Sequence, residues 1–283
     1  MITLFPGLTG KQAETYGLVL SALGICHRIK RQAHTWEISV PAADSEKARM
    51  AVEAYRQENQ DRFRPSRDVF HRFTGTWTGL WVAALLLAVH VTVATRQIHE
   101  PFIRFYGASA RHILDGALYR CVTALLIHAD AVHLVGNMAG IALFGTAVCS
   151  LTGWGAGWLM ILLSGSAGNF LNAFLFETGH ISIGASTAVF GALGILSGHQ
   201  FVGKYRLPGQ RLKALLPLGG GVALLGLLGS AAHSDITAHM FGFLCGTGMG
   251  ACWALWIRQP PPEKYQIGSA CIAVLILLLS WMP

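Results

Sequence analysis

Residues 131–176 read AVHLVGNMAGIALFGTAVCSLTGWGAGWLMILLSGSAGNFLNAFLF and contain no Asp, Glu, Lys or Arg. A helix that crosses a bilayer needs about 20 predominantly apolar residues. This stretch of 46 residues is therefore long enough for two crossings. Gly153-Trp154-Gly155 divides it and has the composition of a tight turn. The sequence thus predicts two adjacent membrane-spanning helices.

Other charge-free stretches extend this pattern. We expect seven membrane helices, the last being the shortest: residues 76–95, 131–151, 155–176, 184–203, 213–233, 236–257 and 266–282. The predicted fold is an all-α polytopic membrane bundle that follows a small N-terminal α/β soluble domain. The domains are residues 1–70, a six-helix membrane domain at 76–257, and an additional helix at 266–282.

Composition supports this division. Hydrophobic residues make up 53% of the chain and charged residues 12%, against roughly 25% charged in soluble domains. Residues 1–75 hold 19 of the 35 charged residues. These values exclude an all-soluble enzyme, a disordered chain and a nucleic-acid binder. The expected partners are the lipid bilayer and membrane proteins, not nucleic acid; the sequence does not predict an oligomeric state.

Lys and Arg predict the orientation. With the N-terminus inside, the inside segments carry 17 of these residues and the outside segments carry four. Basic residues favour the cytoplasmic side, so we expect a cytoplasmic N-terminus and an external C-terminus. The first strongly apolar segment begins near Trp77, so we expect no cleaved signal peptide and a retained first helix.

The soluble head and the first external segment carry no catalytic motif. We expect residues 96–128 to lie against the outer membrane interface. In the head, hydrophobic periodicity predicts two helices and a strand pair: Thr9–Leu23 and Ser45–Glu58, with Ile25–Arg31 and Thr35–Val40.

Polar side chains cluster in the predicted bundle, where they are costly and often functional. His133 and Asn137 lie one turn apart in the second helix. Ser186 begins the fourth helix and His239 the sixth. These three helices run in the same direction, so all four side chains lie within roughly 5–14 Å of one membrane face. The topology alone lets them share one depth.

Glycine rows predict which helices touch. Gly191, Gly194 and Gly198 form a small-residue face on the fourth helix. Gly242, Gly246 and Gly250 form another on the sixth, beginning at His239. Small faces allow close helix approach, so docking them would bring Ser186 beside His239.

A hydroxyl beside an imidazole is the minimum for nucleophilic catalysis. His133, Asn137 and the backbone at the start of the fourth helix can supply N–H donors to an oxyanion. Asp235 is able to orient His239, although capping its helix together with Ser234 is the better interpretation. For any one of these polar residues alone, an interhelical hydrogen bond is the better interpretation; the four together, at one depth on parallel helices, favour a site. His128 and His133 have poor metal-ligand spacing, so we expect no metal site and no cofactor.

These residues resemble the rhomboid family of intramembrane serine proteases. The matching motifs are His133-x-x-x-Asn137, Gly184-x-Ser186-x-x-x-Phe190-Gly191 and Ala238-His239-x-x-Gly242, with Tyr119-Arg120 and Gly168-Asn169 in support. The resemblance covers about residues 76–257. It implies Ser186 as nucleophile, His239 as base, and His133 and Asn137 in the oxyanion hole. Gly184, Phe190 and Gly242 are the implied supporting residues, Phe190 placing its ring against the catalytic His.

The resemblance also implies substrates and location. Single-span membrane proteins would be cut near the outer membrane face, at small residues in segments that unwind easily, by a protein of the bacterial inner membrane. One departure concerns a Glu that many rhomboids carry near the inner end of the second helix to brace the first loop. Residues 145–150 here read GTAVCS, which puts that bracing in doubt.

The same residues argue against three other functions. A catalytically inactive rhomboid-like protein that binds membrane clients usually lacks the Ser or the His, and both are present. A transporter would favour charged residues near mid-membrane or repeat symmetry, and the sequence has neither. A zinc protease motif is absent because Pro101 follows His99-Glu100, and Asp130 and Asp235 lie at helix ends, unlike the aspartates of an aspartyl protease.

Overall fold

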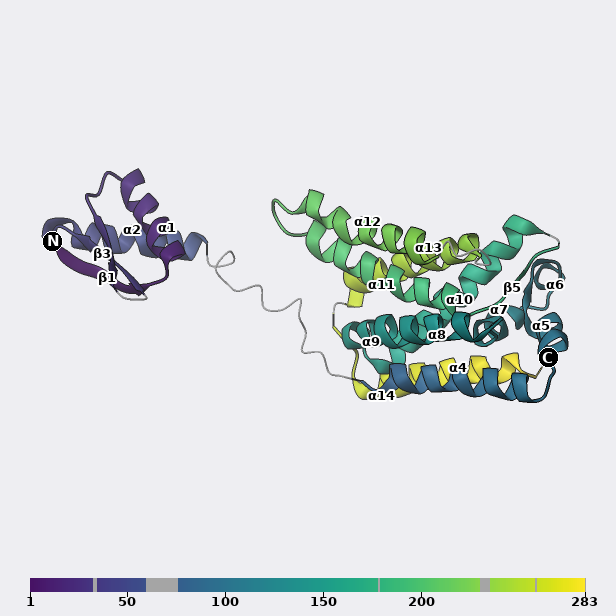
Figure 1. The fold of residues 1–283 in the computed structure, drawn as a ribbon. Helices are drawn as coiled ribbons and strands as arrows, with labels where there is room; N and C mark the ends of the chain where they lie inside the picture. Colours follow the sequence, from purple (N-terminus) through teal and green to yellow (C-terminus); the bar gives the residue numbers. More distant parts are fainter. Residues whose placement is uncertain (33–34, 60–75, 178, 230–234, 258, 283) are drawn as a thin grey trace. The chain divides into compact units, whose positions relative to one another are not determined.

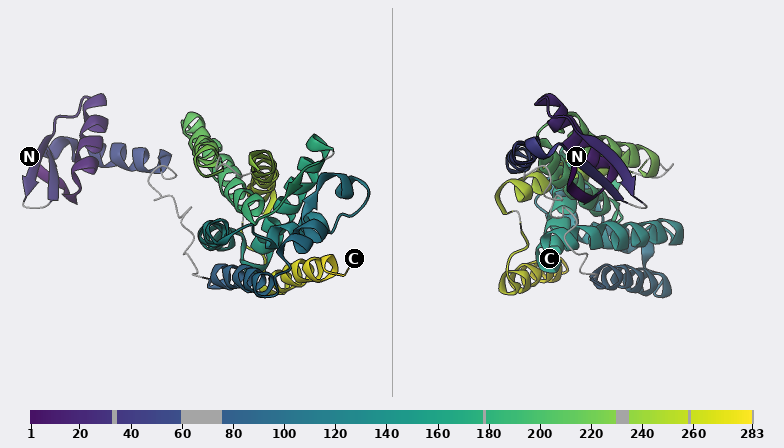
Figure 2. Two further views of the ribbon diagram at one scale, coloured as in Figure 1. Left: turned by 45° about the vertical axis from the view of Figure 1, so that its right-hand side comes forward. Right: turned by 90° about the vertical axis from the view of Figure 1, so that its left-hand side faces the viewer.

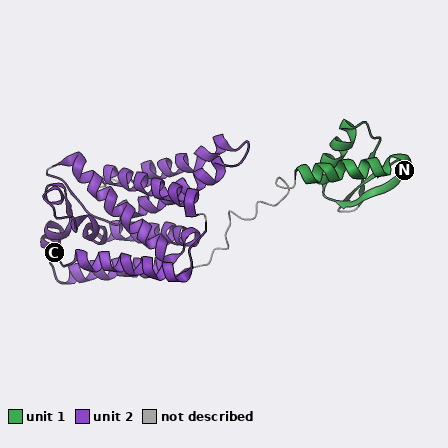
Figure 3. Cartoon of the chain, turned by 180° about the vertical axis from the view of Figure 1, so that it is seen from behind, with its two compact units in different colours: residues 1–70 green, residues 71–283 purple. Residues whose placement is uncertain are grey.

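The computed structural model describes residues 1–32, 35–59, 76–177, 179–229, 235–257 and 259–282. Its contacts divide the chain into two compact units, Met1–Phe70 and His71–Pro283 (Figure 3). The hydrophobic core of each unit is formed by its own residues. We therefore describe the units one at a time.

The first unit is a three-stranded antiparallel sheet with two helices. Its strands are ordered β1-β3-β2. Its elements are β1 Ile2–Leu8, α1 Gly10–Ala22, β2 Arg28–Gln32, β3 Thr35–Val40, the short helix η1 Ala42–Asp44, and α2 Ser45–Glu58. Both predicted helices and the predicted strand pair are present. Thr9 begins α1 with a reciprocal capping box: its hydroxyl accepts from the Gln12 N–H, and Gln12 Oε1 accepts from the Thr9 N–H.

Strand β1 was not predicted. It contains Pro6 and Gly7, residues that favour turns. It pairs with β3 with irregular register on either side of Phe5, and Leu8 at its end is buried in the core with Ile38 and Val40 of β3. An edge strand can accommodate Pro and a broken ladder, which is why this strand does not show the alternation of a regular one.

The second unit is a helical bundle (Figure 1). Its long helices are α4 Thr78–Thr95, the continuous α8 Ala131–Gly140, η3 Ile141–Gly145 and α9 Thr146–Thr152, then α10 Trp154–Phe176, α11 Ser186–Tyr205, α12 Arg211–Leu228, α13 Ile236–Cys252 with η4 Trp253–Ile257, and α14 Glu263–Ser280. The short elements are α5 His99–Tyr106, β4 Ala108–Ser109, α6 Ala110–Leu114, α7 Arg120–Thr123, η2 Ala124–Leu126 and β5 Ile181–Ser182. Figure 1 shows α5, α6, α7 and β5 together at one end of the bundle.

Six helices in the described part of the chain are long and apolar enough to cross a membrane. The predicted fourth span, α11, is long enough but less apolar. It is largely buried and packs against α10, α12, α13 and η3. A helix surrounded by protein does not need lipid-facing side chains. The all-α polytopic fold with a small N-terminal domain is thus confirmed.

The last helix, α14, is fixed to the bundle by one buried side chain. Gln266 Oε1 accepts hydrogen bonds from the backbone N–H groups of Gly155 and Ala156, at 2.9 and 3.0 Å, and its Nε2 donates to the Thr152 carbonyl at 3.1 Å. These groups belong to the turn between α9 and α10, which the sequence predicted at Gly153. Gln266 therefore satisfies the free N–H groups at the start of α10 while joining α14 to it.

Candidate active site

Ser186 and His239 meet at the start of two helices. Ser186 is the first residue of α11 and His239 is the fourth of α13. The distance between Ser186 Oγ and His239 Nε2 is 2.7 Å. His239 is only 5% exposed. With a neutral imidazole, the hydroxyl donates to Nε2, which is the arrangement that a general base requires before it removes a proton.

The contact depends on the close approach of α11 and α13. A Cβ atom added at Gly242 would overlap the carbonyl oxygen of Thr187, the residue after the serine. One at Gly246 would overlap the Gly191 carbonyl, and one at Gly250 the Ile195 carbonyl. The two glycine rows identified in the sequence therefore face each other, backbone to backbone, as small-residue membrane interfaces do.

Two aromatic rings enclose the pair. The Phe190 ring lies 4.8 Å from the His239 ring, centroid to centroid, so the ring expected beside this histidine is there. On the other side, a Cβ at Gly184 would lie 2.6 Å from His133 Nε2 and 3.4 Å from Ser186 Oγ. The His133 ring thus occupies the space beside Gly184, next to the serine. Gly184 has φ = 116°, a backbone conformation that favours glycine.

Asn137 supplies an unsatisfied donor in the same region. It lies one turn after His133 on α8 and is 5% exposed. In the described part of the chain its Nδ2 has no hydrogen-bond partner. Leaving a buried donor unpaired costs about 1–3 kcal/mol. Such a group is suited to bind an oxygen that arrives with a ligand.

Asp235 makes its hydrogen bonds away from His239. Its carboxylate accepts from Asn172 Nδ2 at 2.7 Å, Thr237 Oγ1 at 2.8 Å and the Ala238 N–H at 3.0 Å, and it pairs with His180 Nε2. Burial raises the pKa of this carboxyl group, but the hydrogen bonds from His180, Ala238 and Thr237 outweigh it, and the pKa lies below its ordinary value. The structure therefore gives Asp235 the helix-capping role; the suggested second cap, Ser234, lies outside the described residues.

The segment between α4 and α8 is held without the helix-two Glu. Arg120 is 5% exposed, and its Nη1 donates to the carbonyls of Arg104 and Gly107 at 3.0 and 3.1 Å. Thr123 Oγ1 donates to the Tyr106 carbonyl at 2.6 Å. Strand β4 pairs with β5, Ala108 opposite Ser182, four residues before Ser186. Backbone pairing and one buried Arg thus brace the loop against the segment that leads into the candidate nucleophile.

His128 is a site residue that the sequence analysis missed. It lies in the segment before α8 and is 1% exposed. Its Nε2 accepts from the Ala185 N–H at 3.4 Å, directly before Ser186, and its ring lies 5.3 Å from the His133 ring. Burial, followed by the charges of His133 and His90, lowers the pKa of His128. Only the tertiary fold brings this loop under residue 185, so no local pattern marks it.

The site holds hydrogen-bond donors and a nucleophile. In the residues that the structure describes, no three His, Cys, Asp or Glu side chains are arranged to hold a metal ion. His133 and His128 pack ring against ring. The side chains that meet here are a hydroxyl, three imidazoles and an amide, beside the backbone N–H groups at the start of α11.

Comparison with known proteins matches the part of the chain that contains these residues. Residues 115–256 match the model of the rhomboid domain, half of the chain. "Rhomboid protease GluP" of Bacillus subtilis is 25% identical over 256 residues, 86% of this chain and 47% of the relative. "Putative rhomboid protease YdcA" of the same organism is 31% identical over 139 residues, 47% of this chain and 66% of the relative.

Plant relatives match the same region. "RHOMBOID-like protein 1" of Arabidopsis thaliana is 30% identical over 133 residues, 47% of this chain. The matches span 34% to 49% of the length of five such Arabidopsis proteins. Sequence motifs, a six-span helical bundle and the domain match converge on one conclusion: the chain is a multi-pass membrane protein that belongs to the rhomboid family.

Proposed function

We propose that this protein is an intramembrane serine endopeptidase that uses a Ser-His dyad. The observation that carries the proposal is the 2.7 Å distance between Ser186 Oγ and His239 Nε2 inside a membrane bundle. The names of two bacterial relatives, both given as rhomboid proteases, support it. The resemblance to the family implies single-span membrane proteins as the substrates.

The reaction uses each group in turn. As Ser186 Oγ bonds to the substrate carbonyl carbon, its proton passes to His239 Nε2. The carbonyl oxygen becomes an oxyanion, which accepts from His133, Asn137 and the Ser186 N–H. The C–N bond then breaks, and His239 returns the proton to the leaving amine. Water repeats these steps on the acyl-enzyme, which releases the new carboxyl terminus and restores Ser186.

Three residues support this arrangement. Phe190 limits the movement of the His239 ring, Gly184 leaves room for His133, and Gly242 allows α13 to approach Thr187. The substrate segment must leave its helix before it reaches Ser186, because a helical carbonyl is already hydrogen-bonded. This requirement agrees with the preference that the family resemblance implies, for small residues in segments that unwind easily.

We place the protein in the inner membrane of a bacterium, with residues 1–70 in the cytoplasm and the C-terminus outside. The excess of Lys and Arg on one side motivates this orientation. No catalytic group lies before residue 128, so deletion of residues 1–70 should leave measurable proteolysis in a folded bundle. Complete loss of activity in a truncated protein with a normal melting curve would contradict this division of roles.

The decisive experiment compares four proteins in liposomes with a panel of single-span substrates. Ser186→Ala and His239→Ala should each abolish cleavage, and the double variant should be little worse, because the two residues act as a unit. Ser197→Ala, on the same helix and also buried, is the matched control and should cleave normally. A serine-reactive fluorophosphonate should label only proteins that retain the dyad.

The inactive, client-binding alternative predicts a different result. All four proteins would then bind substrates without cutting them, and no fluorophosphonate adduct would form at Ser186. Normal cleavage by a well-folded Ser186→Ala protein would refute the protease proposal itself. Thermal melting of each variant separates loss of chemistry from loss of fold.

A further inference from the structure

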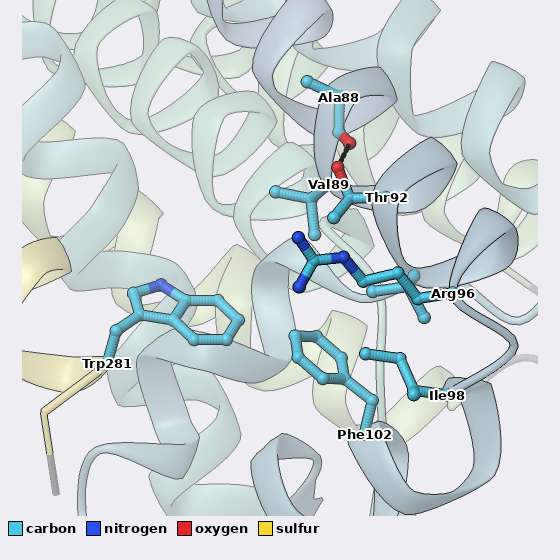
Figure 4. A pocket seen from close by; sticks show the side chains of 8 residues that line it. Ala88, Val89, Thr92, Arg96, Ile98, Phe102 and Trp281 are labelled. Carbon is cyan, nitrogen blue, oxygen red and sulfur yellow. Dashed lines mark hydrogen bonds between the residues drawn. The ribbon is translucent and has the colours of Figure 1, made fainter.

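A cavity lies at the end of the bundle that carries α5, between α4, α5 and the residue after α14. Its volume is about 360 Å³, within the range of small-ligand sites. Its walls are mostly apolar and include Val89 and Val93 of α4, Ile98, Phe102 of α5, and Trp281 (Figure 4). No group that we assign to the dyad or the oxyanion hole lines it.

One charged side chain enters this apolar space. The Arg96 guanidinium lies between Val89, Phe102 and Trp281 in Figure 4. Among the described residues, no carboxylate lies within ion-pairing distance of it. The Arg96 side chain is exposed, so its charge is accessible to a ligand at the edge of these apolar walls. Its surroundings therefore favour an anionic group with an apolar body.

The position of Arg96 in the membrane narrows the choice. It directly follows α4, one of the helices long and apolar enough to span a bilayer. The end of such a helix lies where hydrocarbon gives way to lipid headgroups. Trp281 directly follows α14, another such helix, and Trp is enriched at this depth. A lipid with its phosphate at Arg96 and an acyl chain along α4 would have its headgroup and its hydrocarbon at the matching depths of the bilayer.

We propose that this cavity binds one anionic phospholipid. Its phosphodiester oxygens accept hydrogen bonds from Arg96, and one acyl chain packs against Ala88, Val89 and Val93. Phe102 stacks on Trp281, with ring centroids 5.4 Å apart, so the site joins α14 to the first external segment. A lipid that binds only the folded bundle stabilises this junction.

Native mass spectrometry of the full-length protein tests the proposal. The probes are phosphatidylglycerol and phosphatidylcholine with identical acyl chains, titrated into the detergent-solubilised protein. The wild type should retain one phosphatidylglycerol in preference to phosphatidylcholine. Arg96→Gln should weaken this retention about fivefold, the effect of one cation near a lipid surface. Arg104→Gln, an exposed Arg on α5 outside the cavity, is the matched control and should retain the lipid normally.

A second variant tests the apolar half of the site without changing charge. Ala88 is exposed and lines the cavity, so Ala88→Phe fills the space while the core stays intact. It should reduce retention of phosphatidylglycerol, and glycerol phosphate without acyl chains should not compete. Equal weakening by Arg96→Gln and Arg104→Gln would overturn the proposal, because it would indicate a diffuse surface charge. Unchanged retention by Ala88→Phe would overturn it too, since the acyl chain would then lie elsewhere.

Discussion

Helices α11 and α12 follow each other in the chain and have similar lengths, 20 and 18 residues, but they differ in how much of each is buried in the protein. Twelve residues of α11 are buried, against two of α12. In the left panel of Figure 2, α12 lies at the edge of the bundle. Yet α12 is the one that is apolar enough to count as a membrane span. The apolar composition of α12 is that of a helix in contact with lipid, whereas the burial of α11 is that of a helix in contact with protein. Ser186 lies on α11, the helix that protein surrounds.

The largest effect should come from exchanging one glycine on each helix. A Cβ at Gly194 of α11 would overlap the Phe243 carbonyl and lie 2.8 Å from the Thr247 nitrogen. A Cβ at Gly219 of α12 would meet nothing within 4 Å. Overpacking usually costs about 1–3 kcal/mol, and more where backbone must move. Gly194→Val should therefore remove most of the folded population and all activity, as read by thermal melting and cleavage.

The matched change on α12 should have little effect. Gly219→Val should melt within a few degrees of the wild type, because its side chain enters open space. Similar melting curves for the two variants would show that α11 and α13 are not in backbone contact. That outcome would also remove the structural reason for Ser186 to lie beside His239.

The next effect concerns Asn137, a hydrogen-bond donor of α8, the helix that packs on α11. A Cβ at Gly140 of α8 would lie 2.7 Å from a methyl group of Val189 on α11. Asn137→Ala should lower the cleavage rate by about 10²–10³, the usual cost of one oxyanion donor. Asn137→Leu keeps the volume without the donor and should lose as much. Normal activity in the Leu variant would assign Asn137 to packing.

The contact between α11 and α13 was predictable because its signal is local. Glycines at every third or fourth residue lie on one helix face, and they do so before any fold is known. Helix direction followed from the order of spans, which placed Ser186 and His239 at the same end. These arguments need only helix geometry, and the 2.7 Å Ser186–His239 distance agrees with them.

Other parts of the site depend on contacts that have no local pattern. His128 reaches Ala185 across 57 positions in the chain, and Asn172 reaches Asp235 across 63. The bracing of the segment between α4 and α8 was put in doubt from one missing Glu, yet Arg120 and the β4–β5 pair hold it. Many kinds of side chain can donate hydrogen bonds to backbone carbonyls. The lack of one Glu therefore does not show that the segment is unbraced.

A smaller effect should appear in how the melting temperature depends on pH. It comes from His128, which contacts the Ala185 N–H just before α11. The folded protein lowers the pKa of His128 from its ordinary value near 6.5, so the unfolded chain binds the proton first as the pH falls. The stabilising contribution is complete above about pH 6.5 and is lost progressively below it, by at most about 1.4 kcal/mol per pH unit. The melting temperature of His128→Gln should thus fall less between pH 6.5 and 5 than that of the wild type.

A matched control separates this group from the other titrating residues. His112→Gln changes an exposed histidine of α6 whose Nδ1 contacts Ser109 Oγ of β4. That variant should keep the wild-type slope of melting temperature against pH. If His128→Gln also kept it, the proton taken up on unfolding would have to come from another group.

The smallest effect on the cleavage rate should come from Asp235, the residue whose position most resembles that of the Asp in a catalytic triad. The Asp235 carboxylate is occupied by Asn172, His180, Thr237 and the Ala238 N–H, so it caps α13 and does not hold the His239 ring. A triad Asp typically matters about 10⁴-fold, whereas Asp235→Asn should change the cleavage rate less than tenfold. Asp115→Asn, which loses only an exposed contact with Arg111, is the control for charge removal. A fall of a thousandfold or more in a well-folded Asp235→Asn protein would mean that the dyad is a triad. Asp235 at the start of α13 would then act in catalysis together with His239, whereas the hydrogen bonds of its carboxylate predict that only His239 does.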